Sequence, residues 1–113
     1  MMIMLANLLL FVSCSYTKSY DYLMTHPLVL KKMMLQCDES DLPECTDVKR
    51  AAQDFSELVN ERQDDPQQFG MKIMAAQQEL ANLRLQHATP QARTEQQQKI
   101  NVLYAVVAVT SGG

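Results

Sequence analysis

The stretch DDPQQFGMKIMAAQQELANLRLQ, residues 64–86, decides the fold class of this chain. Its apolar side chains recur at alternating steps of four and three residues. This spacing places them on one face of an α-helix and predicts a seam of the kind that joins antiparallel helices or coiled coils. The seam pairs either within the chain or between two copies of it. Its members are Phe69, Ile73, Ala76, Leu80 and Leu83.

The limits of this helix are marked on both sides. Asp64 or Asp65 is suited to cap its start, and Pro66 falls in the first turn, where a missing N–H is tolerated. The sequence His87-Ala-Thr-Pro90 ends it. Gly70 costs about 1 kcal/mol relative to alanine inside a helix, and a close approach of another backbone would be a reason for it.

Two further helices are expected on the N-terminal side. Thr25 as a cap and Pro27 in the first turn predict a helix whose buried face includes Cys37. The sequence Asp41-Leu-Pro-Glu44 resembles a capping box that opens the next helix, which should run to about Gln63. The apolar face of that second helix consists of Val48, Ala52, Phe55, Leu58 and Val59.

The C-terminal region begins polar and ends apolar. Residues 91–99 are glutamine-rich, and Gln96 to Gln98 are expected to form a solvated helical face. Residues 100–109, INVLYAVVAV, suit either a helix or a strand. A lone strand would lack a partner, so a helix that begins near Pro90 is favoured, and the apolar part is too short to span a bilayer.

Composition limits both the fold class and the classes of function that are open to this chain. The chain has 113 residues, 10 basic and 13 acidic, and a formal charge of −3, which argues against a broad nucleic-acid-binding face. With 2 His and 3 Cys, and without a glycine-rich phosphate loop or nucleophile elbow, it offers few groups for catalysis, a metal or a cofactor. We therefore expect a non-enzymatic, all-α domain of about four helices over residues 25–111.

Three groups of side chains each allow two interpretations. His26 is either a contact or cap at a helix start, or an ordinary turn residue. The methionines are expected to be adaptable core filling, and the alternative is a partner-binding surface. The acidic cluster is expected to be a solvated loop that also favours a helix N-terminus, and the alternative is a cation site. The methionines are Met24, Met33, Met34, Met71 and Met74, and the acidic residues are Asp38, Glu39, Asp41, Glu44 and Asp47.

The first twelve residues, MMIMLANLLLFV, are almost entirely apolar and match the hydrophobic region of a secretory signal. The run ends at Leu10-Phe11-Val12-Ser13-Cys14, which resembles a bacterial lipobox. On this interpretation residues 1–13 are a signal peptide, Cys14 is lipidated, and residues 14–24 form a tether. No Lys or Arg precedes the run, and the alternative is a buried N-terminal helix with an incidental cysteine.

If Cys14 carries lipid, Cys37 and Cys45 remain. Two cysteines in an exported chain favour a disulfide, which over so short a loop would contribute about 2–3 kcal/mol. Free buried thiols and a metal site are the alternatives, although the spacing is not that of a Cys-x-x-Cys pair.

The order of these features resembles a known family. The shared order is a lipobox cysteine, a short linker, Tyr-x-x-x-His-Pro, a helix that ends in cysteine, an acidic proline-containing loop and a second cysteine that opens a helix. In this order the chain resembles the entry-exclusion lipoproteins (EexN-like) of conjugative plasmids and type IV secretion systems. The residues that carry the resemblance are Cys14, Tyr22, His26, Pro27, Cys37, Pro43 and Cys45.

The resemblance implies a lipid-anchored protein of the bacterial envelope that faces the periplasm and blocks redundant DNA transfer. Its partner would be a protein component of the secretion apparatus, and it would use no cofactor beyond the lipid. Ser15 after the lipidated cysteine slightly favours the outer membrane over the inner. A structural subunit of a type IV secretion apparatus and an unrelated periplasmic binding lipoprotein are the alternatives. Helix 66–86 is a candidate surface for homo-oligomers.

Overall fold

A computed structural model describes residues 19–37, 43 and 45–111 of the chain. The predicted all-α fold is confirmed, since these residues form helices and turns and contain no strand. None of the described helices is both long and apolar enough to cross a bilayer. The helices are α2 (Tyr20–Thr25), α3 (Pro27–Cys37), α4 (Cys45–Asp64), α5 (Pro66–Leu85) and α6 (Pro90–Ser111).

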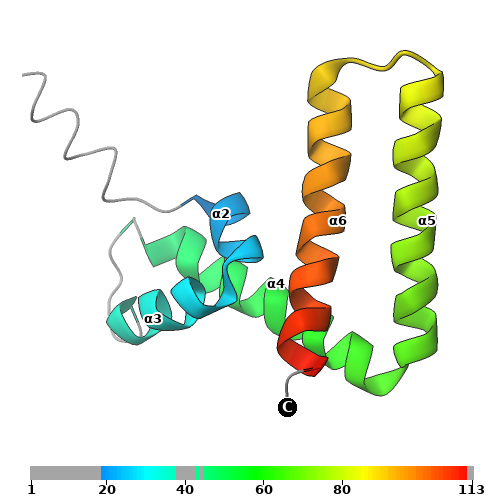
Figure 1. The fold of residues 1–113 in the computed structure, drawn as a ribbon. Helices are drawn as coiled ribbons and strands as arrows, with labels where there is room; N and C mark the ends of the chain where they lie inside the picture. The colour runs from blue at the N-terminus through cyan, green and yellow to red at the C-terminus, as the bar shows by residue number, and fades with distance from the viewer. Residues whose placement is uncertain (1–18, 38–42, 44, 112–113) are drawn as a thin grey trace, which may run out of the picture.

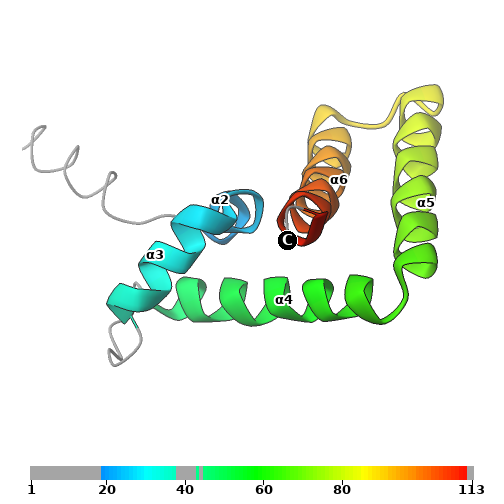
Figure 2. The same ribbon diagram turned by 60° about the horizontal axis from the view of Figure 1, so that its bottom comes forward.

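Helix α4 is the element that organises the others, because it packs against each of the other four described helices. Helices α2 and α3 cover its N-terminal part, while α5 and α6 lie side by side as an antiparallel hairpin (Figure 1). A second view shows α3 near one end of α4 and α5 at the other end (Figure 2). The radius of gyration is 17.6 Å, against about 13 Å for a compact domain of about 100 residues, so the molecule is elongated.

The hairpin begins and turns where the sequence marks it. The Asp65 side chain accepts a hydrogen bond from the Gln68 N–H at 3.0 Å and caps α5, with Pro66 at the first position as predicted. His87 has a φ of 55°, in the left-handed region that allows a helix to end abruptly. Residues 100–109 are helical, as favoured, because α6 runs from Pro90 to Ser111.

Helix α2 (Tyr20–Thr25) occupies the C-terminal part of the segment 14–24 that was expected to be a tether. The Ser19 side chain caps it by accepting from the Tyr22 N–H at 3.2 Å, and Leu23 and Met24 are buried in the core. The helical domain therefore begins at Tyr20 and not at residue 25. The prediction that Thr25 caps the following helix was wrong, because Thr25 ends α2 and its hydroxyl donates to the Tyr22 carbonyl at 3.1 Å.

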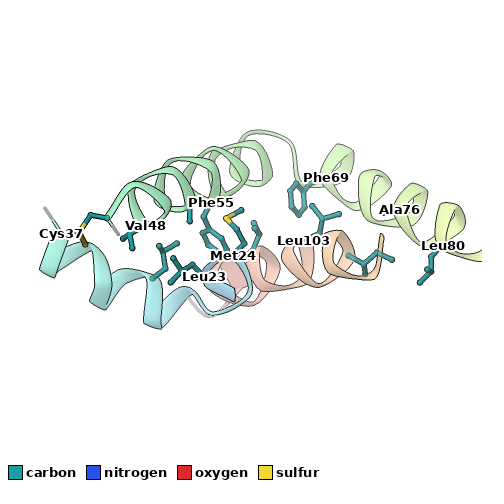
Figure 3. Close-up of a cluster of buried hydrophobic side chains, with 14 residues drawn as sticks. Leu23, Met24, Cys37, Val48, Phe55, Phe69, Ala76, Leu80 and Leu103 are labelled. Carbon is teal, nitrogen blue, oxygen red and sulfur yellow. A yellow bond between two sulfur atoms is a disulfide. The ribbon is translucent and has the colours of Figure 1, made fainter. Parts of the chain in front are cut away.

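One continuous apolar core runs from α3 to the middle of the hairpin (Figure 3). Of the predicted seam, Phe69, Ala76 and Leu80 are buried, while Ile73 and Leu83 are partly covered. Because α5 packs against α6, the seam is used within the chain. The buried side chains are Leu23, Met24, Leu30, Cys37, Cys45, Val48, Ala51, Phe55, Phe69, Ala76, Leu80, Ile100, Leu103 and Val106.

Two regions of the hairpin are less tightly packed than the sequence suggested. A Cβ atom added at Gly70 would meet no heavy atom within 4 Å, so the expected close approach of another backbone is absent there. Residues 81–99, which include the far end of the hairpin, contain no buried side chain. At the far end of the hairpin, the two helices therefore contact each other without fully burying any side chain.

Candidate partner-binding site

Cys37 and Cys45 form a disulfide with their Cα atoms 5.6 Å apart. Both residues are buried, and the bond joins the last residue of α3 to the first residue of α4. The predicted pairing is confirmed, and the alternatives of free thiols or a metal site at these cysteines were wrong. Cys14, the predicted lipidation site, lies outside the described residues.

The Tyr-x-x-x-His-Pro motif forms the corner between α2 and α3. The rings of Tyr22 and His26 are stacked with their centroids 3.8 Å apart. The Nδ1–H of His26 donates a hydrogen bond to the Tyr22 carbonyl oxygen, 2.7 Å away. Pro27 then starts α3. His26 is exposed and caps the end of α2, where its backbone N–H donates to the Leu23 carbonyl, and not the start of a helix as expected.

Pro43, the other proline of the motif, is exposed in a turn, and its carbonyl accepts from the Thr46 N–H at 3.2 Å. In the acidic cluster, Asp38, Glu39, Asp41 and Glu44 lie outside the described residues, and so do both acidic residues of the predicted capping box. Asp47 is exposed and lies 3.5 Å from the guanidinium of Arg50. Within the described part of the chain, no group of three or more His, Cys, Asp and Glu side chains is placed to hold a metal ion.

Tyr20 fastens α2 to α4. Its hydroxyl donates to the Asp54 carboxylate at 2.5 Å, and the Arg50 guanidinium lies 4.3 Å from the centre of its ring. Burial, together with the hydrogen bond and the charge of Asp54, raises the pKa of Tyr20 to about 12. The neutral phenol is therefore held in a fixed position, as expected for a packing contact.

A groove of about 640 Å³ lies between α2, α4, α5 and α6. Apolar side chains such as Met24, Leu58 and Leu103 line it, with charged side chains of α5 and α6 around them. Lys72, one of these, pairs with Glu61 of α4 at 2.5 Å. Among the described residues, no side-chain nitrogen or oxygen is buried without a hydrogen-bond partner.

The glutamine run was predicted as a solvated face, and that interpretation was incomplete. The Gln96 side chain donates to the Ala76 carbonyl at 2.9 Å, and the Gln98 side chain donates to the Asp21 carbonyl at 2.8 Å. Both amides therefore join α6 to another helix. Only Gln97 makes the local contact of a solvated face, since it bonds Asn101 one turn along.

Helix α5 also carries a second face, which points to solvent. Met71, Met74 and Leu85 are 56%, 68% and 78% exposed, although the methionines were expected to fill the core. With two uncharged neighbours they form a stripe at steps of three and four residues, the spacing of a coiled-coil seam. We call this set the outer stripe; its members are Met71, Met74, Gln78, Ala81 and Leu85.

The sequence analysis gave a partner-binding surface as the alternative role of the methionines, but it did not single out the outer stripe. The same spacing that revealed the buried seam is present in the sequence, but Gln78 and Ala81 make the stripe weakly apolar, so it did not stand out. Flexible, polarizable methionine side chains suit surfaces that bind other proteins. An uncharged stripe along a helix of 20 residues is suited to receiving another helix.

Comparison with known proteins yielded no match: no family model, no curated protein and no solved structure is significantly similar to this chain.

Proposed function

We propose that this protein is a non-enzymatic, lipid-anchored entry-exclusion factor of the bacterial envelope. It would face the periplasm and bind a protein component of a conjugative type IV secretion apparatus. The sequence supports this through the lipobox-like end at Cys14 and the motif that ends in His26-Pro27. The Cys37–Cys45 disulfide is in keeping with an exported chain.

The observation that carries the proposal is the outer stripe of α5. Met71, Met74 and Leu85 expose apolar surface on a helix that leads away from α4, and the stripe contains no charged residue (Figure 1). A helix of the partner would lay its own apolar face along the stripe, with side chains interlocking as in a coiled coil. A lipid anchor concentrates the protein at the membrane, so that modest contacts suffice.

The test is a mating experiment. The chain is produced alone in a recipient strain, and transfer frequency is measured from a donor with the matched secretion system and from an unmatched donor. We expect a drop for the matched donor only. An unchanged frequency from the matched donor would refute the exclusion function.

A variant pair locates the binding surface. The double substitution Met71→Lys and Met74→Lys places two charges on the outer stripe and should restore transfer to the level of an empty recipient. The matched control is Ser56→Lys, which adds a charge at an exposed position of α4. Equal loss in the control, or full exclusion by the double variant, would rule out the stripe as the binding surface.

The same system separates exclusion from a structural role. An exclusion factor is dispensable in the donor, whereas a structural subunit is needed there and co-purifies with the apparatus in fixed proportion. Failure of transfer from a donor that lacks the protein would therefore favour the structural subunit.

A further inference from the structure

The solvent-facing side of α3 carries two of the three most exposed large apolar residues among those the structure describes. Leu28 and Leu35 are 83% and 77% exposed. They are seven residues apart, two helical turns, and therefore share one face. Lys31 and Lys32 lie between them in the sequence and are exposed as well. The opposite side of α3, with Leu30 and Cys37, is buried.

The angular positions of these four residues around α3 define the composition of its exposed face. At about 100° per residue, Leu28 and Leu35 lie in the middle of the exposed side, and Lys31 and Lys32 fall to either side of them. The face therefore has an apolar centre with a cation on each flank. No described residue forms an ion pair with either lysine.

The charge of this segment differs from that of the whole chain. From Tyr22 to Cys37 the sequence contains two lysines and no acidic residue, while the chain as a whole has a net charge of −3. Leucine side chains flanked by lysines, whose alkyl stems bury while their ammonium groups reach phosphates, are the arrangement of helices that lie in a membrane interface. The complementary surface is an apolar layer covered by anionic headgroups.

The sequence also places this face within reach of a membrane. Ser19, the first described residue, is five positions after Cys14, and five residues span at most about 18 Å. Helices α2 and α3 follow directly. This step rests on the anchor in the proposed function, but not on exclusion or on a secretion partner.

We propose that the outward face of α3 lies on an anionic lipid surface, with Leu28 and Leu35 in the headgroup layer and Lys31 and Lys32 against lipid phosphates. Since α3 and α5 lie at opposite ends of α4 (Figure 2), this contact leaves the outer stripe free for its partner. The contact would fix the orientation of the protein relative to the membrane, which attachment at a single lipidated residue does not set.

The experiment uses the absence of tryptophan from the chain. The full chain is produced with Leu35→Trp as its single tryptophan and reconstituted in vesicles of phosphatidylglycerol and phosphatidylethanolamine, or of phosphatidylcholine alone. Emission wavelength and quenching by brominated lipid tails are measured. The matched control is Ser56→Trp, at an exposed position of α4, and Leu28→Trp is a second reporter on α3.

We expect the emission of both α3 reporters to shift to shorter wavelength and to be quenched in the anionic vesicles, with neither effect in the Ser56→Trp control. Adding Lys31→Gln and Lys32→Gln should lower the ratio of docked to undocked protein about 30-fold, from about 1 kcal/mol for each lysine near an anionic surface. High salt should weaken the contact in the same direction.

Three outcomes would overturn the proposal: no shift in the α3 reporters, the same shift in the control, or an equal shift in neutral vesicles. The mass of the N-terminal peptide shows separately whether Cys14 carries lipid. Loss of the anchor, loss of α3 docking and loss of exclusion in the mating experiment are thus three distinguishable results.

Discussion

The base of the molecule, α2 to α4, and the hairpin of α5 and α6 are held together by different means. In the base, a disulfide joins α3 to α4, and Tyr20 bonds Asp54 between α2 and α4. The hairpin has a single seam of buried residues, which ends at Leu80 on one helix and at Ile100 on the other. Beyond these two residues, the contacts are partly exposed.

If the outer stripe binds the partner as proposed, that surface lies on the hairpin, whereas the disulfide and the Tyr20–Asp54 hydrogen bond lie in the base. Regions with few buried contacts open locally at lower free energy than the core does. The outer stripe extends along α5 into that less protected region, as far as Leu85.

The largest effect is expected where the two regions meet. Phe69 is 1% exposed at the start of α5, and Phe69→Ala should lower the free energy of unfolding by about 4 kcal/mol through lost burial and a cavity. Urea unfolding followed by circular dichroism measures the change. Met74→Ala, exposed on the same helix, is the control, with a loss below about 0.5 kcal/mol. Similar losses in both would mean that Phe69 does not join the regions.

Removal of the disulfide tests the base alone. Replacing Cys37 and Cys45 by alanine should cost about 2.5 kcal/mol, because the unfolded chain regains the freedom of the closed loop. Amide hydrogen exchange should increase in α3 and change least in residues 81–99, which serve as the internal control. An increase that is largest at the end of the hairpin would contradict the division into two regions.

Tyr20 links α2 to the base in a way that depends on pH. The pKa of Tyr20 is about 12 in the folded chain and 10.0 in a model peptide, so the folded state holds the proton more tightly. The contribution of the protonated Tyr20 side chain to the free energy of unfolding is complete below pH 10 and is lost as the pH rises to about 12. Tyr20→Phe should cost about 1 kcal/mol at neutral pH and remove this loss at high pH.

Unfolding measured across that pH range tests this prediction, with Tyr104→Phe as the control because Tyr104 is exposed on α6. The control should keep the loss at high pH. If the two variants behave alike, the Tyr20–Asp54 contact would not be the source of the pH dependence.

The smallest expected effect is an increase in the free energy of unfolding. Because a Cβ at Gly70 meets no heavy atom within 4 Å, Gly70→Ala should stabilise the protein by about 0.8 kcal/mol through helix propensity. The comparison is Ala81→Gly, the reverse change further along α5. If the end of the hairpin opens before the rest, Ala81→Gly will change the global transition by less than Gly70→Ala does. A larger effect at Ala81 would place the end of the hairpin inside the cooperative unit.

Most helix limits and the disulfide could be predicted, because each rests on a local rule. Pro66 and Pro90 sit at helix starts, and two cysteines remained after one was assigned to lipid. The seam of Phe69, Ala76 and Leu80 followed from its spacing. The all-α class needed no information beyond these patterns.

The features that the sequence did not predict depend on contacts between residues far apart in the chain. Helix α2 has six residues, too few for a periodic pattern, and its burial comes from contacts with α4 and α6. The amides of Gln96 and Gln98 bond main-chain oxygens 20 and 77 positions away, which no residue pattern encodes. Spacing identified the buried seam of α5, but it did not single out the outer stripe as a second seam-like face.

The bond from Gln98 to the Asp21 carbonyl has an evolutionary consequence. Its acceptor is a main-chain atom, which every residue type supplies. Position 21 is exposed, so its residue type can change without loss of this hydrogen bond, provided that glutamine stays at position 98. Among natural relatives, this junction of the first described helix with the last would be seen as a fixed glutamine opposite a variable site, and no pair of positions would change together.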